Sequence, residues 1–233
     1  MKVKLESRLL GANELIAHNN RNMFSSRGIL VINLMSSPGS GKTTILECTI
    51  QELAKQIKIG VIEGDLYTDQ DARRIEQQGV EVVQINTEGT CHLDAQMISH
   101  AYQKLDASKP QLLFIENVGN LVCPAEFDLG EDLRVVVIST AEGNDKVTKY
   151  PLVFRRADVV LVNKTDLLPY TDFDVEKVKN DIGLINPSAS IFLISGRTGE
   201  GMEAWICWLL QQSKNKLLSM NETSYLQMAE GRE

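Results

Sequence analysis

The chain has 233 residues, of which 43% are hydrophobic and 24% charged, a composition typical of one globular domain. Its net charge of −7 argues against a nucleic-acid surface, which requires clustered Lys and Arg, and no apolar run approaches the roughly 20 residues of a membrane span. Because residues 1–8 also lack a signal-peptide core, we expect a cytoplasmic protein that binds neither nucleic acid nor a membrane.

A leading helix is predicted over residues 4–26, followed by short apolar runs that alternate with longer segments of helical period. Apolar strands separated by helices indicate a mostly parallel sheet with helices on both faces, where ligands bind beyond the carboxyl ends of the strands. We expect a single domain over residues 1–213 and, because residues 214–233 lack apolar periodicity, a disordered polar tail. The seven predicted strands are 29–35, 58–62, 80–85, 112–116, 133–139, 159–163 and 191–195.

The first predicted strand leads into a glycine turn that ends in Gly-Lys-Thr, the pattern of a phosphate-binding loop. Gly39 and Gly41 can adopt dihedrals closed to other residues, so that backbone N–H groups point at an anion. Lys42 is expected to neutralise the β- and γ-phosphates, and the Thr43 hydroxyl to bind Mg²⁺. Ser36 stands where the usual pattern has glycine. The motif predicts an α/β P-loop NTPase whose phosphate-binding residues are Ser37, Gly39, Ser40, Gly41, Lys42, Thr43 and Thr44.

Carboxylates follow two further strands of the predicted sheet. Asp65 ends the second strand, and Glu116 ends the fourth in the D/E-x-x-G form of a γ-phosphate sensor. We expect Thr43, Asp65 and Glu116 to hold Mg²⁺ and Gly119 to meet the terminal phosphate, with Lys42 completing the catalytic group. A helix cap is the alternative role for Asp65.

The sixth predicted strand leads into Asn-Lys-Thr-Asp, which matches the guanine-reading pattern N-K-x-D. The Asp166 carboxylate can accept hydrogen bonds from guanine N1–H and the exocyclic amine, a donor pair that adenine lacks. Lys164 is expected to lie along the base, and Asn163 to tie neighbouring loops together. A second loop, after the last strand, supports the base through Ser195, Gly196 and Arg197.

Two cysteines and a histidine follow strands three and four. Cys91, His92 and Cys123 form a thiolate and imidazole set that suits Ni²⁺ or Zn²⁺, and a thiol at a helix N-terminus has a lowered pKa that favours metal binding. Three donors leave a four-coordinate site incomplete, and a twofold dimer could supply the remainder. The alternative is that these cysteines are inert apolar residues, the role that we expect for Cys48 and Cys207.

Together these motifs resemble the HypB family, the GTPases of nickel–iron hydrogenase maturation, over residues 5–213. The resemblance implies a GTP-dependent homodimer that hydrolyses GTP with Mg²⁺ and binds a metal through Cys91, His92 and Cys123 at the subunit interface. It also implies delivery of nickel to the hydrogenase large-subunit precursor, alongside a partner nickel chaperone. Residues 142–146 resemble a region that contacts the neighbouring subunit's nucleotide. The motifs most specific for the family are Gly-Thr-Cys-His-Leu-Asp-Ala and Glu-Asn-Val-Gly-Asn-Leu-Val-Cys-Pro.

Two other functions stay open at this point. A urease-type nickel-insertion GTPase is expected to carry Cys-Pro-His instead of Cys-His, and a regulatory GTP switch would have purely structural cysteines. The ligand types do not separate nickel from zinc. We expect slow hydrolysis, because no arginine finger is evident, and a metal affinity that depends on the nucleotide, because Cys123 lies four residues after Gly119.

Overall fold

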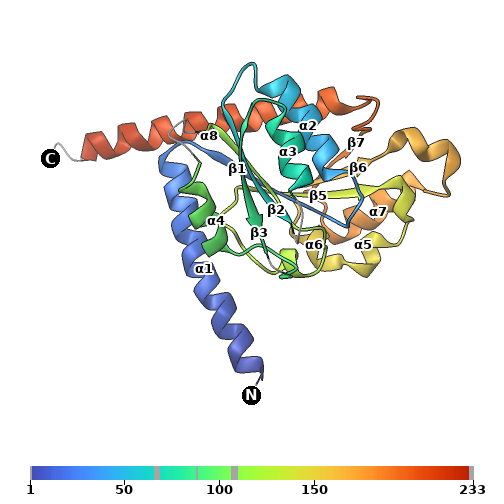
Figure 1. Ribbon diagram of the computed structural model, residues 1–233, viewed down its shortest axis with the longest axis horizontal. Helices are drawn as coiled ribbons and strands as arrows, with labels where there is room; N and C mark the ends of the chain where they lie inside the picture. Colours follow the sequence, from blue (N-terminus) through green and yellow to red (C-terminus); the bar gives the residue numbers. More distant parts are fainter. Residues whose placement is uncertain (1, 66–68, 88, 106–109, 231–233) are drawn as a thin grey trace.

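A computed structural model describes residues 2–65, 69–87, 89–105 and 110–230 of the chain. Its centre is a sheet of seven strands in the order β3-β2-β4-β1-β5-β6-β7, and every pair of neighbours is parallel (Figure 1). All seven predicted strands are present, with ends shifted by at most three residues. The strands are β1 (Leu30–Ser36), β2 (Ile59–Asp65), β3 (Glu81–Asn86), β4 (Leu112–Glu116), β5 (Leu133–Ser139), β6 (Val159–Asn163) and β7 (Ser190–Leu193).

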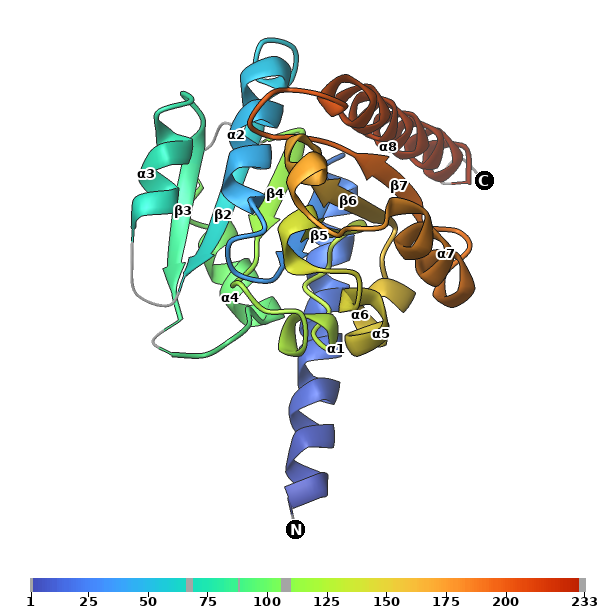
Figure 2. The ribbon, with the colours of Figure 1, turned by 90° about the vertical axis from the view of Figure 1, so that its right-hand side faces the viewer.

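Helices cover both faces of the sheet (Figure 2). One face packs against α2, α3 and α8, and the other packs against α1 and α4 and, further along, α5, α6 and α7. The helices are α1 (Lys2–Ser26), α2 (Lys42–Leu53), α3 (Gln70–Glu76), α4 (Ala95–Tyr102), α5 (Lys146–Lys149), α6 (Pro151–Arg155), α7 (Val175–Ile185) and α8 (Met202–Glu230), with short 3₁₀ turns η1 (Cys123–Ala125), η2 (Thr140–Glu142) and η3 (Thr165–Tyr170).

The central strand β1 is buried along its whole length, which explains its nearly continuous apolar sequence. Ile32 and Leu34 pack toward α2 and α8, whereas Val31 packs toward α1 and α4, as the alternation of side chains along a strand requires. Asn33 is fully buried although it is polar. Its amide must therefore find partners inside the protein.

The last helix, α8, differs from the sequence prediction of a disordered tail from residue 214. It continues to Glu230, and residues 231–233 lie outside the described part of the chain. Lys216 explains part of this order, because its Nζ donates to Ser25 Oγ at 2.9 Å and to Asp132 Oδ1 at 2.5 Å. Met220 lies against Gly28, where an added Cβ would meet its sulfur at 2.8 Å. These contacts are with residues remote in sequence, so local periodicity does not reveal them.

Candidate functional site

The turn between β1 and α2 gathers the predicted phosphate-binding residues. Gly39 and Gly41 have φ angles of 75° and 97°, in the left-handed region that favours glycine. A Cβ at Gly41 would also collide with the side chain of Asn163. Lys42 is buried at the start of α2, and its Nζ donates to Ser36 Oγ at 2.9 Å. The serine that replaces glycine in the usual pattern therefore holds the phosphate-binding lysine.

A cavity of about 480 Å³ lies beside this turn, at the carboxyl ends of the strands. Thr43 Oγ1 donates to Glu116 Oε1 at 2.7 Å, so two of the three predicted magnesium ligands are in direct contact. Asp65 lines the same cavity, as does Gly119, which packs against Pro38 of the phosphate loop. Burial raises the pKa of Glu116, and its Oε2 accepts no hydrogen bond from the described residues. A buried carboxylate oxygen without a donor suits a divalent cation.

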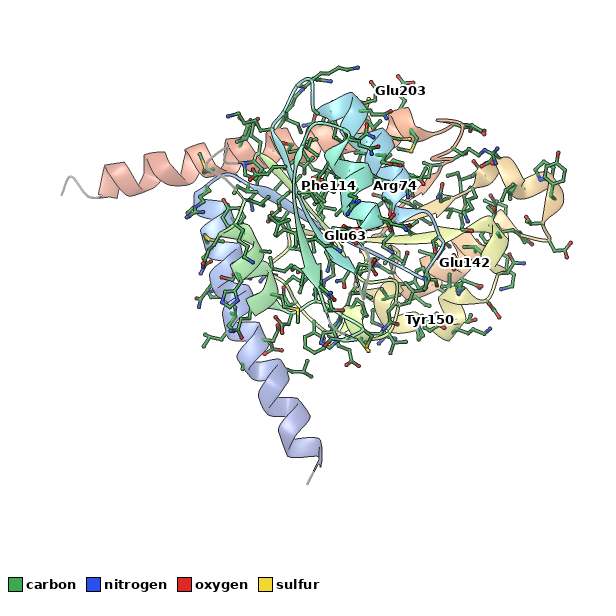
Figure 3. All side chains as sticks on the ribbon, viewed as in Figure 1. Glu63, Arg74, Phe114, Glu142, Tyr150 and Glu203 are labelled. Carbon is green, nitrogen blue, oxygen red and sulfur yellow. The ribbon has the colours of Figure 1, made fainter. Side chains whose placement is uncertain are left out.

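Three charged residues of this cavity were not recognised from the sequence: Glu63, Asp71 and Arg74. Figure 3 labels Glu63 and Arg74. Glu63 is the neighbour of Glu116 in the β2–β4 register, and burial, followed by the charge of Glu116, raises its pKa to about 8. Arg74 of α3 donates to Thr44 Oγ1 at 3.3 Å and to Glu47 at 2.6 Å. A charged residue inside an apolar strand was a usable signal for Glu63. The position of Arg74 depends on how α3 packs on α2, which no local pattern encodes.

A smaller cavity, of about 240 Å³, adjoins the first and contains the N-K-x-D motif. Ser195 Oγ donates to Asp166 Oδ1 at 2.6 Å and orients the carboxylate that is expected to read guanine. Asn163 donates to the Ser40 carbonyl oxygen at 2.8 Å and accepts from the Gly196 N–H at 3.0 Å. The structure thus gives Asn163 the bridging position expected from the sequence, between the phosphate loop and the loop after β7.

Lys164 lines both cavities. Its φ of 64° is the only positive value at a non-glycine residue in the part of the chain that the structure describes. Thr140 donates to its carbonyl oxygen at 2.6 Å, and its own Nζ donates to the Gly39 carbonyl oxygen at 2.7 Å. The aliphatic chain of Lys164 therefore extends between the smaller cavity, where the base is expected, and the larger cavity, where the phosphates are expected. Arg197 lies at the other side of the smaller cavity.

Residues 142–146 contact the phosphate loop of their own chain. Glu142 accepts a hydrogen bond from Ser40 Oγ at 2.9 Å. Lys146 Nζ donates to Ser37 Oγ at 3.1 Å and lies 3.4 Å from a Glu142 carboxylate oxygen. The contact of this segment with a neighbouring subunit's nucleotide, which the resemblance implies, stays a prediction.

The predicted metal ligands converge at the same end of the sheet. Cys91 and His92 lie in the loop between β3 and α4, and Cys123 begins the turn η1. One ligand atom from each residue can be chosen so that all three lie within 4.8 Å of one another, and the two sulfur atoms are 3.0 Å apart. The His92 ring stacks on Phe127, with centroids 3.9 Å apart. Two thiols and an imidazole in this arrangement fit a soft transition metal and leave one tetrahedral position open.

Cys91 does not lie at the N-terminus of a helix, contrary to the expectation from the sequence. Cys91 precedes the first residue of α4 by four positions, and the N-cap of that helix is Asp94. The hydrogen bond with Cys91 raises the pKa of Cys123, and partial burial adds to this effect. Burial lowers the pKa of His92, which favours the neutral imidazole that binds metals.

The other two cysteines lie outside this cluster. Cys48 is half-buried on α2 and its thiol donates to the Gly196 carbonyl oxygen at 3.0 Å. Cys207 is exposed, so its expected place in the core is wrong. Trp205 is buried on α8, and Trp208 stacks on it. Cys207 lies two positions after Trp205, a rotation of about 200° around the helix, and therefore faces away from the buried side of Trp205.

Among the described residues, no helix has both the length and the apolar character needed to cross a membrane.

Comparison with known proteins gives three consistent results. Residues 30–193 match the family model of the CobW/HypB/UreG nucleotide-binding domain. Hydrogenase maturation factor HypB of Azotobacter vinelandii is 50% identical over 215 residues, which cover 92% of this chain and 71% of the relative. HypB of Archaeoglobus fulgidus superimposes with a TM-score of 0.82 and 43% identity, over 87% of this chain and 99% of that structure. HypB of Helicobacter pylori in complex with nickel superimposes with a TM-score of 0.84 and 40% identity, over 88% of this chain and 97% of that structure.

Proposed function

Because the chain belongs to the CobW/HypB/UreG family and, within it, to the HypB hydrogenase maturation factors, we propose that it is a GTP-hydrolysing nickel metallochaperone. Nickel is its cargo and binds at Cys91, His92 and Cys123. The observation that carries the proposal is the convergence of these three donors beside the phosphate cavity. The nickel complex of the H. pylori relative supports this ion, and zinc is the competing ion because it accepts the same ligands.

Hydrolysis uses the larger cavity. Lys42 neutralises charge on the β- and γ-phosphates, and the Gly119 N–H meets the terminal phosphate. Thr43, Asp65 and Glu116 hold Mg²⁺, which supplies positive charge to the phosphates when bound. The contact between Thr43 and Glu116 supports this assignment, because both oxygens can turn toward one ion.

Guanine selectivity uses the smaller cavity. Asp166 accepts from both guanine donors, and Ser195 fixes the carboxylate in place. An adenine base would leave the same carboxylate desolvated without donors, at a cost of about 1–3 kcal/mol or more. Arg197, from the loop after β7, lines this cavity, and the neighbouring Gly196 N–H donates to Asn163.

Dimer formation completes the metal site. One chain offers three donors, and a twofold axis through the site would bring the same residues from a second chain. Cys91 is exposed, as is Val122 beside Cys123, so these residues are accessible to a second copy. GTP favours the dimer when Lys146 exchanges Ser37 for the nucleotide of the partner.

The protein delivers nickel to the hydrogenase large-subunit precursor and receives it from a partner nickel chaperone. In cells that lack their own copy of the gene, the wild-type chain should restore hydrogenase activity and Cys91→Ala should not. Cys207→Ala, which alters an exposed cysteine outside the site, should restore it. A regulatory switch with structural cysteines would instead tolerate Cys91→Ala.

The biochemical test loads the purified chain with Ni²⁺ and a non-hydrolysable GTP analogue, then records its mass in solution and its absorption spectrum. A dimer with thiolate-to-nickel charge-transfer bands is expected, and Cys123→Ala should remove the bands while Cys207→Ala retains them. A monomer without such bands would reject the proposal. Phosphate release from GTP, with ATP as the comparison, measures the slow hydrolysis directly.

A further inference from the structure

Two asparagines hold the backbone on both sides of His92. Asn117 Oδ1 accepts from the N–H of Leu93, the residue after His92, at 3.4 Å. Asn120 Nδ2 donates to the carbonyl oxygen of Cys91, the residue before His92, at 3.2 Å. Both asparagines belong to the segment that follows β4, which carries the predicted phosphate sensor. The loop of two metal ligands is therefore attached to the strand end at the phosphate cavity.

Asn120 also connects the two halves of the metal site. Its Oδ1 accepts from the N–H of Val122 at 3.0 Å, directly before Cys123. The Asn120 side chain thus forms hydrogen bonds with the backbone of both loops, at Cys91 in one and next to Cys123 in the other. Its short side chain fixes the separation of the two loops, and with it the spacing of the two sulfur atoms.

Asn117 lines the larger cavity but is almost fully buried, with 1% of its surface exposed, and it makes two further hydrogen bonds. Its Oδ1 also accepts from the Val118 N–H at 3.0 Å, and its Nδ2 donates to Asn33 Oδ1 at 3.2 Å. Asn33 Nδ2 donates to Glu131 Oε1 at 3.4 Å, and Glu131 Oε2 accepts from the Leu129 N–H at 2.7 Å. Asn33, the buried polar residue of β1, therefore has a hydrogen-bond partner for both its oxygen and its nitrogen.

This series of buried hydrogen bonds ends at Leu129, close in sequence to Phe127, which also contacts His92. Leu129 lies two residues after Phe127, whose ring stacks on the imidazole. Loss of Asn117 would remove the acceptor of the Leu93 and Val118 N–H groups and the donor to Asn33 Oδ1, and unpaired buried groups make such a loop shift or open.

We propose that Asn117 and Asn120 are positioning residues of the metal site, which clamp the loop of Cys91 and His92 to the end of β4. The inference rests on the proposed metal-binding function. Residues that orient metal ligands typically change metal affinity by about 10- to 100-fold when removed. The clamp is therefore expected to matter for nickel binding although neither asparagine is a ligand.

The test compares Asn117→Ala and Asn120→Ala with Asn186→Ala. Asn186 is a matched control for Asn117, since it is also a buried asparagine that donates to backbone carbonyl oxygens, at Phe154 and Ala157, and among the described residues it bonds neither the three ligands nor the loop of Cys91 and His92. Nickel affinity is measured by chelator competition in the nucleotide-free protein. Each clamp variant should bind nickel about tenfold more weakly than wild type, and Asn186→Ala should match wild type.

A second readout separates positioning from general destabilisation. Hydrogen exchange of residues 89–95 in the metal-free protein should accelerate in both clamp variants and stay slow in Asn186→Ala. Asn117→Asp keeps an acceptor for the Leu93 N–H but turns an oxygen toward Asn33 Oδ1, so it should recover only part of the protection. If Asn117→Ala does not fold, the half-buried Asn120→Ala carries the test.

Nickel affinities within twofold of wild type in the clamp variants would overturn the inference, as would unchanged exchange of residues 89–95. If the wild type bound no nickel at this site, the proposed function would fail. The exchange measurement, which needs no metal, would then still decide whether the asparagines hold the loop.

Discussion

The nucleotide cavities and the metal site lie at the same end of the sheet, but they differ in how far one chain completes them. Around the nucleotide, Lys42, Asn163 and Asp166 each have a fixed partner within the chain. At the metal site, Cys91 is exposed and three donors leave one position open. The comparison teaches that the first site is organised by contacts within one chain, whereas the second, as proposed, needs its supporting loops and further donors from a second copy. Five measurements can sharpen or break this distinction.

The largest effect is expected at the guanine reader. Asp166→Asn replaces one acceptor with a donor that faces guanine N–H groups, so GTP affinity should fall about 100-fold or more. Fluorescent nucleotide titration measures it, and xanthosine triphosphate should bind the variant better than GTP. Ser195→Ala, which removes only the orienting hydrogen bond, should cost less. Equal GTP affinity in Asp166→Asn and wild type would show that guanine binds elsewhere.

The two regions should also influence each other. Cys123 follows the Gly119 sensor by four residues, so nickel affinity should differ about tenfold between the GDP state and a non-hydrolysable GTP analogue. By reciprocity, nickel should change the relative affinity for the two nucleotides by the same factor. Isothermal titration in both orders measures the two factors. Identical nickel affinities in both states would mean that the sites are independent.

Arg74 tests whether the larger cavity uses a second cationic side chain in addition to Lys42. Arg74→Ala should lower kcat/KM for GTP about tenfold, which corresponds to about 1.4 kcal/mol, because the guanidinium reaches Thr44 at the cavity. Arg73→Ala is the matched control, since the adjacent Arg73 pairs with the exposed Asp69. A steady-state phosphate-release assay compares them. If both variants hydrolyse GTP like wild type, Arg74 has no part in the reaction.

Phe127 tests how far the metal site depends on stacking. Phe127→Ala removes the ring that lies on His92, and a lost stacking contact of about 1 kcal/mol corresponds to about fivefold weaker nickel binding. Phe127→Tyr should retain the stacking and the affinity. Chelator competition provides the values for both variants. If Phe127→Ala binds nickel as tightly as wild type, the position of the His92 imidazole does not depend on the Phe127 ring.

The smallest effect is expected where the phosphate loop departs from the usual pattern. Ser36→Gly restores the common glycine and removes the hydrogen bond from Lys42, but the other contacts of the loop remain. GTP affinity should therefore change by only about twofold, less than the full value of one hydrogen bond. A loss above tenfold would show that Ser36 is the main support of Lys42.

The sequence was sufficient for the features that are local. Continuous apolar runs located all seven strands, because burial on both faces demands them whatever the rest of the chain does. The phosphate loop and N-K-x-D were recognisable because each motif is a run of consecutive residues. Cys91, His92 and Cys123 were identified as candidate ligands by their chemistry and their places after strands.

Only the tertiary structure decided what depends on segments remote in sequence. It brought Glu63 next to Glu116, placed Arg74 at the cavity and ordered α8 beyond residue 214 through its contacts with α1. It turned Cys207 toward solvent and raised the pKa of Cys123 through the neighbouring thiol. The physical reason is common to these cases. Burial, hydrogen-bond partners and local charge arise between elements, and a pattern read along one element does not contain them.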